Sequence, residues 1–397
     1  MPASPKPVTG SRFELFASTA PGLESIAAGE LKSLGLRGRQ EIGGVAFAGD
    51  LDRLYQANLW LRTASRVVVR LGHFHASTFY ELERRAKKLP WEAFLPASGS
   101  VRLRVTCRKS RLYHSDAVAE RVLSVISESA SRKIEARGDT PDDEADEAGD
   151  AAQLFIVRII HDEVEISADS SGELLHRRGY RQEVAKAPLR ETLAAAMVLA
   201  SGWRSGEPLL DPMCGSGTIP VEAAMLARGI APGAQRKFQF MNWPTFDERR
   251  WNAILDNARS SATRSTEKIS ASDRDAGAIG AARRNAERAG VVDTIHFSEK
   301  AISDSIADLD EVEKGAAWVL TNPPYGIRIG EGEDLRNLYA RLGAELKTKP
   351  GWRLGVLTPD TGLIGQTKLS MVSRFDTRNG GIPVSFMVSE KPGQKRG

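Results

Sequence analysis

The feature of the sequence that most constrains the fold is an alternation of short apolar segments with helical segments from Pro208 onward. This alternation is typical of strands and crossover helices that build a parallel sheet. The last two apolar segments flank Asn379-Gly380-Gly381, which suits a tight antiparallel turn. We therefore predict an α/β fold, doubly wound, whose parallel sheet ends in an antiparallel hairpin. The predicted strands are 209–210, 269–272, 295–297, 318–320, 354–357, 372–377 and 382–388, with helices starting at Leu189, Thr218, Asp275 and Leu335.

The residues before Pro208 show smaller α+β patterns. Residues 13–72 follow the order strand, helix, strand, helix. A second pattern contains the strand 101–108, in which apolar residues alternate with arginine and threonine, so that one face is apolar and the other basic. Residues 138–150 are acidic, lack aromatic residues and predict a solvated loop. We place the domain boundary in the polar, basic connector 170–187.

Composition predicts a protein of several domains outside the membrane. The 397 residues exceed the length of one ordinary domain, and no segment approaches the ~18 consecutive apolar residues of a membrane span. Met1 to Gly10 lack the apolar core of a secretory signal, and Cys107 and Cys214 are the only cysteines. We expect a cytoplasmic protein without disulfides. The net charge of +4 and pI of 9.0 permit a nucleic-acid partner but do not require one.

The segment Asp211-Pro212-Met213-Cys214-Gly215-Ser216-Gly217-Thr218 is a glycine-rich turn between a predicted strand and a predicted helix. Glycine lets a ligand approach the backbone, and open α/β sheets bind ligands beyond the carboxyl ends of their strands. A dinucleotide motif would need glycine in place of Pro220, and a phosphate loop would need a Gly-Lys-Ser/Thr ending, so neither fits. The leading carboxylate suits a cationic ligand such as S-adenosylmethionine. Taken alone, the segment is also consistent with a simple tight turn.

Two further motifs follow strands of the same sheet. Asp273 ends the next predicted strand, where doubly wound folds place the acid that binds a ribose; the alternative is an N-cap for the helix near Asp275. Thr321-Asn322-Pro323-Pro324-Tyr325-Gly326 follows the strand 316–320. The Asn322 amide and the Pro323 carbonyl would accept hydrogens from an amino group, and Tyr325 would stack on a planar base. The alternative for this motif is an ordinary proline-rich turn.

These motifs resemble those of a known family, the THUMP-domain-containing N2-guanosine RNA methyltransferases, and particularly the bacterial large-subunit (23S) rRNA type. The resemblance covers nearly the whole chain. It is strongest in residues 176–181, 187–193, 211–227, 242–244, 322–330 and 335–342. It implies a ferredoxin-like domain at 11–70, a THUMP RNA-binding domain at 71–168, a linker at 169–187 and a class I (Rossmann-like) S-adenosylmethionine-dependent methyltransferase domain at 188–390.

The resemblance also implies roles for individual residues. Asp211, Gly215 and Gly217 would line the methionine part of the donor, and Asp273 would bind its ribose. Ala301 stands where the family usually has an acid or amide that contacts the adenine, and we expect Asp304 to compensate. The remaining expected donor contacts are Pro212, Met213, Cys214, Thr218 and Asn322, and the expected catalytic residues are Asn322, Pro323, Pro324 and Tyr325.

We predict that basic residues in two segments contact RNA phosphates, although a solvated face is the alternative. These residues are Arg102, Arg104, Arg108, Lys109, Arg111, Arg177, Arg178 and Arg181. Cys214 lies in the donor loop rather than beside Asn322, so we expect it to pack near the donor and not to act as a nucleophile. The histidines share no metal-ligand spacing with cysteine, and we expect no metal site.

We predict direct attack of the guanine N2 amine on the donor methyl group, without a covalent enzyme intermediate. We prefer 23S rRNA as the substrate, or the large-subunit precursor that contains it. Three alternatives stay open: a tRNA guanine-N2 methyltransferase, an N6-adenine methyltransferase, and a non-catalytic RNA-binding or ribosome-assembly protein.

Overall fold

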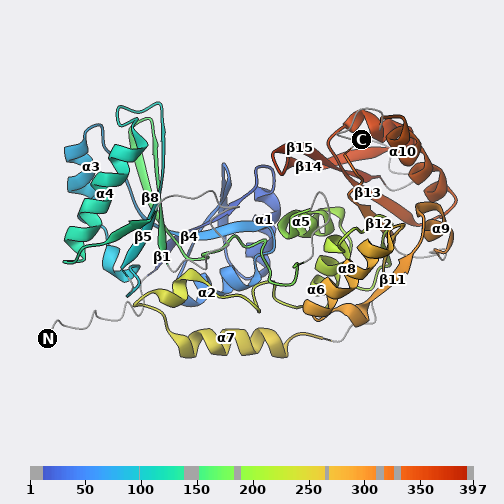
Figure 1. The fold of residues 1–397 in the computed structure, drawn as a ribbon, viewed down its shortest axis with the longest axis horizontal. Helices are drawn as coiled ribbons and strands as arrows, with labels where there is room; N and C mark the ends of the chain where they lie inside the picture. Colours follow the sequence, from blue (N-terminus) through green and yellow to red (C-terminus); the bar gives the residue numbers. More distant parts are fainter. Residues whose placement is uncertain are drawn as a thin grey trace. The chain divides into compact units, whose positions relative to one another are not determined.

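A computed structural model describes residues 12–97, 99–137, 152–182, 189–263, 268–309, 317–325 and 332–390. The chain forms two compact units, which Figure 1 shows in the colours of the sequence. The first unit takes its residues from 1–18, 28–175 and 236–256, and the second from 19–27, 176–235 and 257–397. The predicted acidic loop at 138–150 and residues 183–187 of the predicted connector lie outside the described residues.

The described strands of the first unit form one eight-stranded sheet in the order β2-β3-β1-β4-β8-β7-β5-β6. Strand β5 runs parallel to β6 and β7, whereas β8 is antiparallel to both β4 and β7. The strands are β1 (Phe13–Thr19), β2 (Gly38–Glu41), β3 (Gly44–Gly49), β4 (Ala64–His75), β5 (Ser100–Arg108), β6 (Glu135–Arg137), β7 (Gln153–Ile160) and β8 (Glu163–Asp169).

Strand β4 was missing from the predicted order of elements. Its buried residues Val67, Val68 and Val69 form a continuous apolar run, without the alternation that marks a half-buried strand. The helices in this part of the chain are α1 (Glu24–Ser33), α2 (Leu51–Trp60), α3 (Phe79–Ala86) and α4 (Ser115–Ser129), with a short 3-10 helix at Trp91–Ala93.

Residues 236–256 belong to the first unit, although in sequence they lie between elements of the second. The Tyr55 ring centroid lies 4.6 Å from that of Phe240, and the Tyr55 hydroxyl accepts a 3.0 Å hydrogen bond from the Asp247 amide. Trp243 Nε1 donates to Gln153 Oε1 at 2.6 Å. This segment contains a 3-10 helix (Gln239–Asn242) and most of α7 (Glu248–Ser260). We did not expect residues 236–256 to pack with the first unit. The predicted domain boundaries stay predictions.

The second unit contains the predicted doubly wound sheet. Its described strands have the order β11-β10-β9-β12-β13-β15-β14. The first five are parallel, and β15 is antiparallel to both β13 and β14. The strands are β9 (Leu209–Asp211), β10 (Ile269–Asp273), β11 (Ile295–Glu299), β12 (Ala317–Thr321), β13 (Trp352–Thr358), β14 (Met371–Asn379) and β15 (Ile382–Ser389). The predicted α/β class and the C-terminal hairpin are confirmed.

Helices cover both faces of this sheet (Figure 1). Adjacent residues of a strand point to opposite faces, and so Leu209 packs with α5, α6 and α8, whereas Leu210 packs with α9 and α10. The helices are α5 (Glu191–Ser201), α6 (Thr218–Ala227), α8 (Ala276–Arg288), α9 (Ile302–Ala307) and α10 (Gly332–Lys347), with 3-10 helices at Val292–Thr294 and Thr361–Thr367. No helix in the described part of the chain is long and apolar enough to span a membrane.

Candidate active site

The candidate site lies where the strand order changes direction. From β9 the chain adds β10 and then β11 on one side of the sheet. It then returns to add β12 on the other side of β9, so β9 is paired with both β10 and β12. The carboxyl ends of these three parallel strands carry Asp273, Asp211 and Asn322. Ligands of doubly wound sheets bind at such a switch point, because the connecting helices diverge from it to opposite faces. The three motifs found in the sequence therefore meet at one edge of the sheet.

The glycine-rich turn between β9 and α6 brings backbone groups close together. The Cys214 amide donates to Ser272 O at 3.0 Å, and the Gly217 amide donates to Cys214 O at 2.8 Å. Gly215 and Gly217 have φ angles of 51° and 82°. A β-carbon on Gly217 would lie 2.8 Å from the Ala282 β-carbon of α8. Both the backbone conformation and the packing of α8 therefore require glycine at position 217.

Two carboxylates lie beside this turn. Asp211 Oδ1 accepts the Met213 amide at 3.2 Å, and Asp273 Oδ2 accepts the Gly215 amide at 3.0 Å. Neither carboxylate forms an ion pair with any residue that the structure describes. Burial raises the pKa of Asp211 to about 7, and the charge of Asp273 acts in the same direction. A buried Asp211 beside a half-buried Asp273, without a protein cation among the described residues, is suited to a positively charged ligand.

The alternative role of Asp273 as a helix cap is wrong. Helix α8 is capped by Asp275, whose Oδ1 accepts the amides of Gly277 and Ala278 at 2.7 and 3.3 Å. Asp273 Oδ1 instead accepts the Asp275 amide at 3.1 Å. Asp273 therefore braces the glycine-rich turn and the start of α8 while it remains at the switch point.

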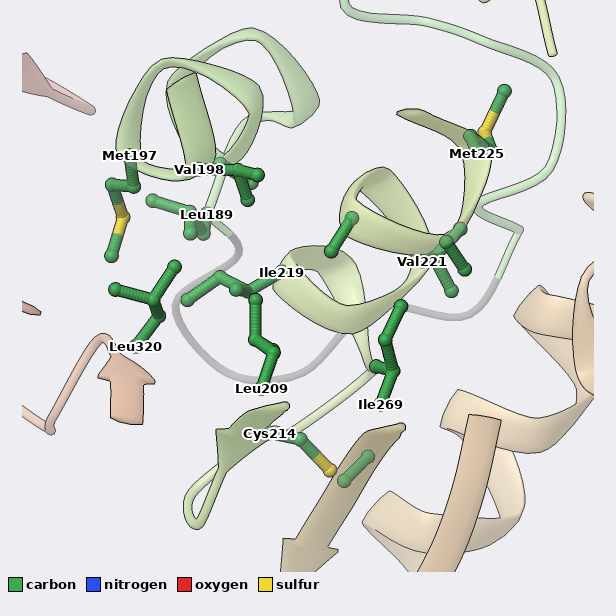
Figure 2. Close-up of a cluster of buried hydrophobic side chains, with 14 of the residues drawn as sticks. Leu189, Met197, Val198, Leu209, Cys214, Ile219, Val221, Met225, Ile269 and Leu320 are labelled. Atoms are coloured by element: carbon green, nitrogen blue, oxygen red, sulfur yellow. The ribbon is translucent and has the colours of Figure 1, made fainter. Parts of the chain in front are cut away.

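Cys214 is part of the hydrophobic core, as expected for a packing residue. Figure 2 shows its side chain in the same cluster as Leu209 and Ile269. Burial raises the pKa of its thiol well above the ordinary value, so the thiol stays protonated and is a poor nucleophile. Pro212 and Thr218 of the same turn are buried and Met213 is half-buried.

The segment after β12 contains a chain of three hydrogen-bonded side chains. The Tyr325 hydroxyl donates to Asn322 Oδ1 at 3.0 Å, and Asn379 Nδ2 donates to the Tyr325 hydroxyl oxygen at 3.0 Å. Tyr325 also packs against the hydrophobic core. We did not identify Asn379 from the sequence, because it reads there as the first residue of a hairpin turn. Residues 326–330, which belong to the same predicted motif, lie outside the described residues.

The expected adenine contact is not tested by the geometry. Asp304 is exposed in the first turn of α9, directly after the loop that follows β11. Its neighbour Ser305 is buried and accepts a 2.7 Å hydrogen bond from Ser272 Oγ at the end of β10. The assignment of Asp304 to the adenine therefore stays a prediction.

Three of the basic residues predicted to contact RNA are buried or partly buried. Arg178 is 2% exposed and pairs with Glu222, and Arg181 pairs with the buried Glu191 at 3.1 Å. Arg102 is 7% exposed and lies beside the buried Leu154 of β7. The burial of Arg102 and Arg178 and the ion pair of Arg181 give no support to phosphate contacts by these three residues, which stay a prediction.

The other basic residues of β5 and its following loop fit the prediction better. Arg108, Lys109 and Arg111 are exposed, whereas Arg104 and Arg177 are half-buried and have interaction partners. The loop is braced, because the Arg111 amide donates to Asp162 Oδ1 at 2.7 Å.

Two aromatic side chains that we did not select from the sequence, Tyr113 and His114, follow these basic residues. The Tyr113 side chain is 68% exposed and its ring centroid lies 4.0 Å from that of His114. In the sequence, this pair is separated from the basic segment by Leu112 alone, and aromatic side chains close to basic ones are typical of nucleic-acid surfaces.

The described residues contain no group of three or more His, Cys, Asp and Glu side chains that could hold a metal ion.

Comparison with known proteins identifies the two parts of the chain. Residues 178–384 match the family model described as the RMKL-like methyltransferase domain. Residues 14–68 match the RlmL ferredoxin-like domain, which confirms the predicted ferredoxin-like domain near the N-terminus. A THUMP domain stays a prediction.

Three curated relatives are similar over most of this chain. A Synechocystis protein provisionally named RNA methyltransferase slr0064 is 35% identical, with 94% of this chain and 96% of the relative covered. The Bacillus subtilis protein YpsC, also provisionally named an RNA methyltransferase, is 34% identical over 87% of this chain and 88% of its own. The ribosomal RNA large subunit methyltransferase K/L of Syntrophotalea carbinolica is 35% identical over 96% of this chain, which spans 54% of that relative.

Two solved structures are similar over nearly their whole length. SMU.472, provisionally described as a methyltransferase and solved in complex with S-adenosylhomocysteine, has a TM-score of 0.82 and 29% identity, with 97% of this chain and 99% of that one covered. A Listeria monocytogenes protein described as a predicted N6-adenine-specific DNA methylase has a TM-score of 0.83 and 34% identity, with 96% and 97% covered. The chain therefore belongs to the RMKL-like methyltransferase family and uses S-adenosylmethionine as its methyl donor.

Proposed function

We propose that this protein methylates the exocyclic N2 amine of a guanosine in RNA, with 23S rRNA as the preferred substrate. The observation that carries the proposal is the position of the Asn322 amide at the same sheet edge as the Asp211 and Asp273 carboxylates. RNA as the substrate is supported by the names of the relatives from Synechocystis, Bacillus subtilis and Syntrophotalea carbinolica. The assignment of guanine as the base and of N2 as the methylated atom rests on the motif around Asn322.

The donor end of the site fits S-adenosylmethionine, which supplies an electrophilic methyl group on a positively charged sulfur. Asp211 offers a buried carboxylate without a protein cation among its described neighbours. Gly215 and Gly217 leave the backbone of the turn open to close approach. Asp273 stands at the end of β10, where a carboxylate accepts hydrogen bonds from ribose hydroxyls. These groups would bind and orient the donor.

The acceptor end of the site fits an aryl amine. Asn322 Oδ1 and the Pro323 carbonyl would each accept one amine hydrogen, which turns the nitrogen lone pair toward the methyl carbon. As the amine nitrogen forms its bond to that carbon, the bond from carbon to sulfur breaks and positive charge develops on nitrogen. The two acceptors bind that charge more strongly than the neutral amine, and this difference lowers the barrier. The surplus proton passes to water.

The RNA surface that we propose consists of Arg108, Lys109, Arg111, Tyr113 and His114 in the first unit. All five side chains are exposed. Cations supply contacts to phosphates that do not depend on sequence, and an exposed aromatic pair offers a face on which an unpaired base stacks. We propose that this surface binds RNA and that the switch point of the second unit carries out the chemistry.

The proposal is tested by transfer of tritiated methyl groups into RNA from cells that lack this enzyme. Wild type, Asn322→Ala and the control Asn252→Ala would be compared, because Asn252 is an exposed amide on α7. We expect label in N2-methylguanosine of 23S rRNA with wild type and control, and at least a hundredfold loss with Asn322→Ala, the scale of one transition-state acceptor.

Nucleoside analysis of the labelled product separates the other substrates. Label in N2-methylguanosine of tRNA would support the proposed reaction but identify tRNA, and not 23S rRNA, as the substrate. In a parallel reaction with DNA as the methyl acceptor, label in N6-methyladenosine would overturn the assignment to guanine, an outcome in line with the description of the Listeria monocytogenes structure. Label that survives in Asn322→Ala would contradict the assigned acceptor, and donor binding without transfer to any nucleic acid would favour a binding role.

A further inference from the structure

The hairpin formed by β14 and β15 places one buried amide at the proposed acceptor site. Asn379 is the last residue of β14 and is paired with Ile382 of β15. The two residues after it, Gly380 and Gly381, have φ angles of 54° and 85°, and the chain can therefore reverse directly beyond Asn379. Asn379 is only 7% exposed, and a buried amide of this kind needs hydrogen-bond partners.

The direction of the two hydrogen bonds is set by the hydrogens available. Asn379 Nδ2 has only hydrogens to give and donates to the Tyr325 oxygen at 3.0 Å. The single hydroxyl hydrogen of Tyr325 then points to Asn322 Oδ1, also at 3.0 Å. Burial raises the pKa of Tyr325 above its ordinary value, so the hydroxyl keeps this hydrogen at neutral pH.

The orientation of the Asn322 amide matters for the proposed chemistry. The oxygen and nitrogen ends of an amide are similar in size, but only the oxygen accepts hydrogens from an amine. If the amide were reversed, the Tyr325 hydroxyl hydrogen would lose its acceptor and an NH2 group would take the place of the carbonyl oxygen. A carbonyl oxygen has two lone pairs, and it can accept from Tyr325 and from a substrate amine together.

We propose that Asn379 is a positioning residue that, through the Tyr325 hydroxyl, holds the Asn322 carbonyl oxygen in the orientation that receives the substrate amine. This inference rests on the proposed function for the identity of the amine. It assigns to the C-terminal hairpin a part in the methyl-transfer step, in addition to completing the sheet.

Four variants test this relay by methyl transfer at saturating donor and RNA. Asn379→Ala removes the donor to Tyr325 and should lower kcat about threefold to tenfold, the scale of one hydrogen bond. Asn379→Asp should lower kcat further, because a carboxylate accepts the hydroxyl hydrogen and draws it away from Asn322. Tyr325→Phe keeps the ring but removes the relay, and Asn379→Ala in that background should have no further effect.

A control in the same hairpin separates the relay from general damage. Arg378 is exposed and donates to Gly381 O at 3.1 Å, so Arg378→Ala perturbs the turn without removing a group that contacts Tyr325. We expect its kcat and the donor KM to match wild type. If Asn379→Ala lowers kcat equally in the wild-type and Tyr325→Phe backgrounds, Asn379 acts only on the structure of the hairpin and the proposal is overturned.

A second readout needs no RNA substrate. The phenol of Tyr325 can be titrated by its ultraviolet absorbance in the difference between wild type and Tyr325→Phe. The hydrogen bond from Asn379 lowers the pKa of Tyr325 against the effect of burial, so Asn379→Ala should shift this titration to higher pH. An unchanged titration would overturn the relay even if RNA is methylated. A shifted titration without RNA labelling by wild type would support the relay and overturn the assigned substrate.

Discussion

Gly217 offers a quantitative test of the turn that precedes α6. Its φ angle of 82° lies in the left-handed region, and a β-carbon there would lie 2.8 Å from the Ala282 β-carbon. The conformation alone costs an L-residue about 1–2 kcal/mol. Overpacking against α8 adds about 1–3 kcal/mol, since α8 has to shift for the two methyl groups to fit. Gly217→Ala should therefore lower the free energy of unfolding by about 2–5 kcal/mol.

A matched control isolates the packing contribution. Gly202 follows α5 with a φ angle of 83°, but its added β-carbon would meet nothing within 4 Å. Gly202→Ala should cost only the conformational 1–2 kcal/mol. Both glycines belong to the second unit, so urea unfolding followed by tryptophan fluorescence reports both losses in the same unit. In a double-mutant cycle, Ala282→Gly should recover about 1–3 kcal/mol in the Gly217→Ala background.

Equal losses of stability in Gly217→Ala and Gly202→Ala would contradict this expectation, because the close approach of position 217 to α8 would then contribute nothing to the free energy of unfolding. The absence of coupling in the cycle with Ala282→Gly would contradict it as well. We further expect Gly217→Ala to weaken donor binding in calorimetry while Gly202→Ala leaves it unchanged, since only the former changes the turn beside Asp211.

Further predictions concern the Asp211 carboxyl group and the proposed RNA surface. The pKa of Asp211 is about 7 in the free protein, so its carboxyl group is ionised in only about a tenth of the molecules at pH 6 and in most of them at pH 8. Because the ionised form binds the cationic donor, donor affinity should rise about tenfold between pH 6 and pH 8. Asp211→Asn should bind weakly at both pH values; an equal pH dependence in this variant would contradict the assignment. The raised pKa also means that Asp211 holds its proton more tightly in the folded state than in the unfolded state. The contribution of Asp211 to the free energy of unfolding therefore falls as pH rises from about 4 to about 7. Replacing both Arg108 and Arg111 with alanine should weaken RNA binding and reduce the slope of log affinity against log salt concentration by about 1.5. Tyr113→Ala should weaken binding without changing that slope, because stacking releases no counterions. An unchanged slope in the arginine variant would remove these residues from the RNA surface.

Much of the methyltransferase part could be predicted from local pattern. The alternation of apolar segments placed β9, β10 and β12 correctly, and parallel strands with crossover helices bring their carboxyl ends to one edge. That geometry is why Asp211, Asp273 and Asn322 could be grouped from the sequence alone. The first unit was less predictable, because β4 has a continuous apolar run and because residues 236–256 join the unit from far along the chain.

The basic residues show the limit of arguments from residue type. Arg108 and Arg178 are equally cationic in the sequence, but Arg108 is exposed and Arg178 pairs with Glu222, 44 residues further along. A buried charge is tolerated only beside a partner, and no spacing rule predicts a partner at that separation. Burial of Arg102 beside Leu154 is likewise a property of strand pairing, which the alternation within one strand does not reveal.

The sequence by itself determined the elements whose cause is local: the strand and helix periodicity, the glycine-rich turn and the Asn322 motif. Only the tertiary structure decided that Asn379 donates to Tyr325, and that Tyr325 donates to Asn322. The physical reason is the separation along the chain over which each interaction acts. Backbone conformation depends on neighbours within a few residues, whereas the partner of a buried polar group is selected by the packing of the whole sheet.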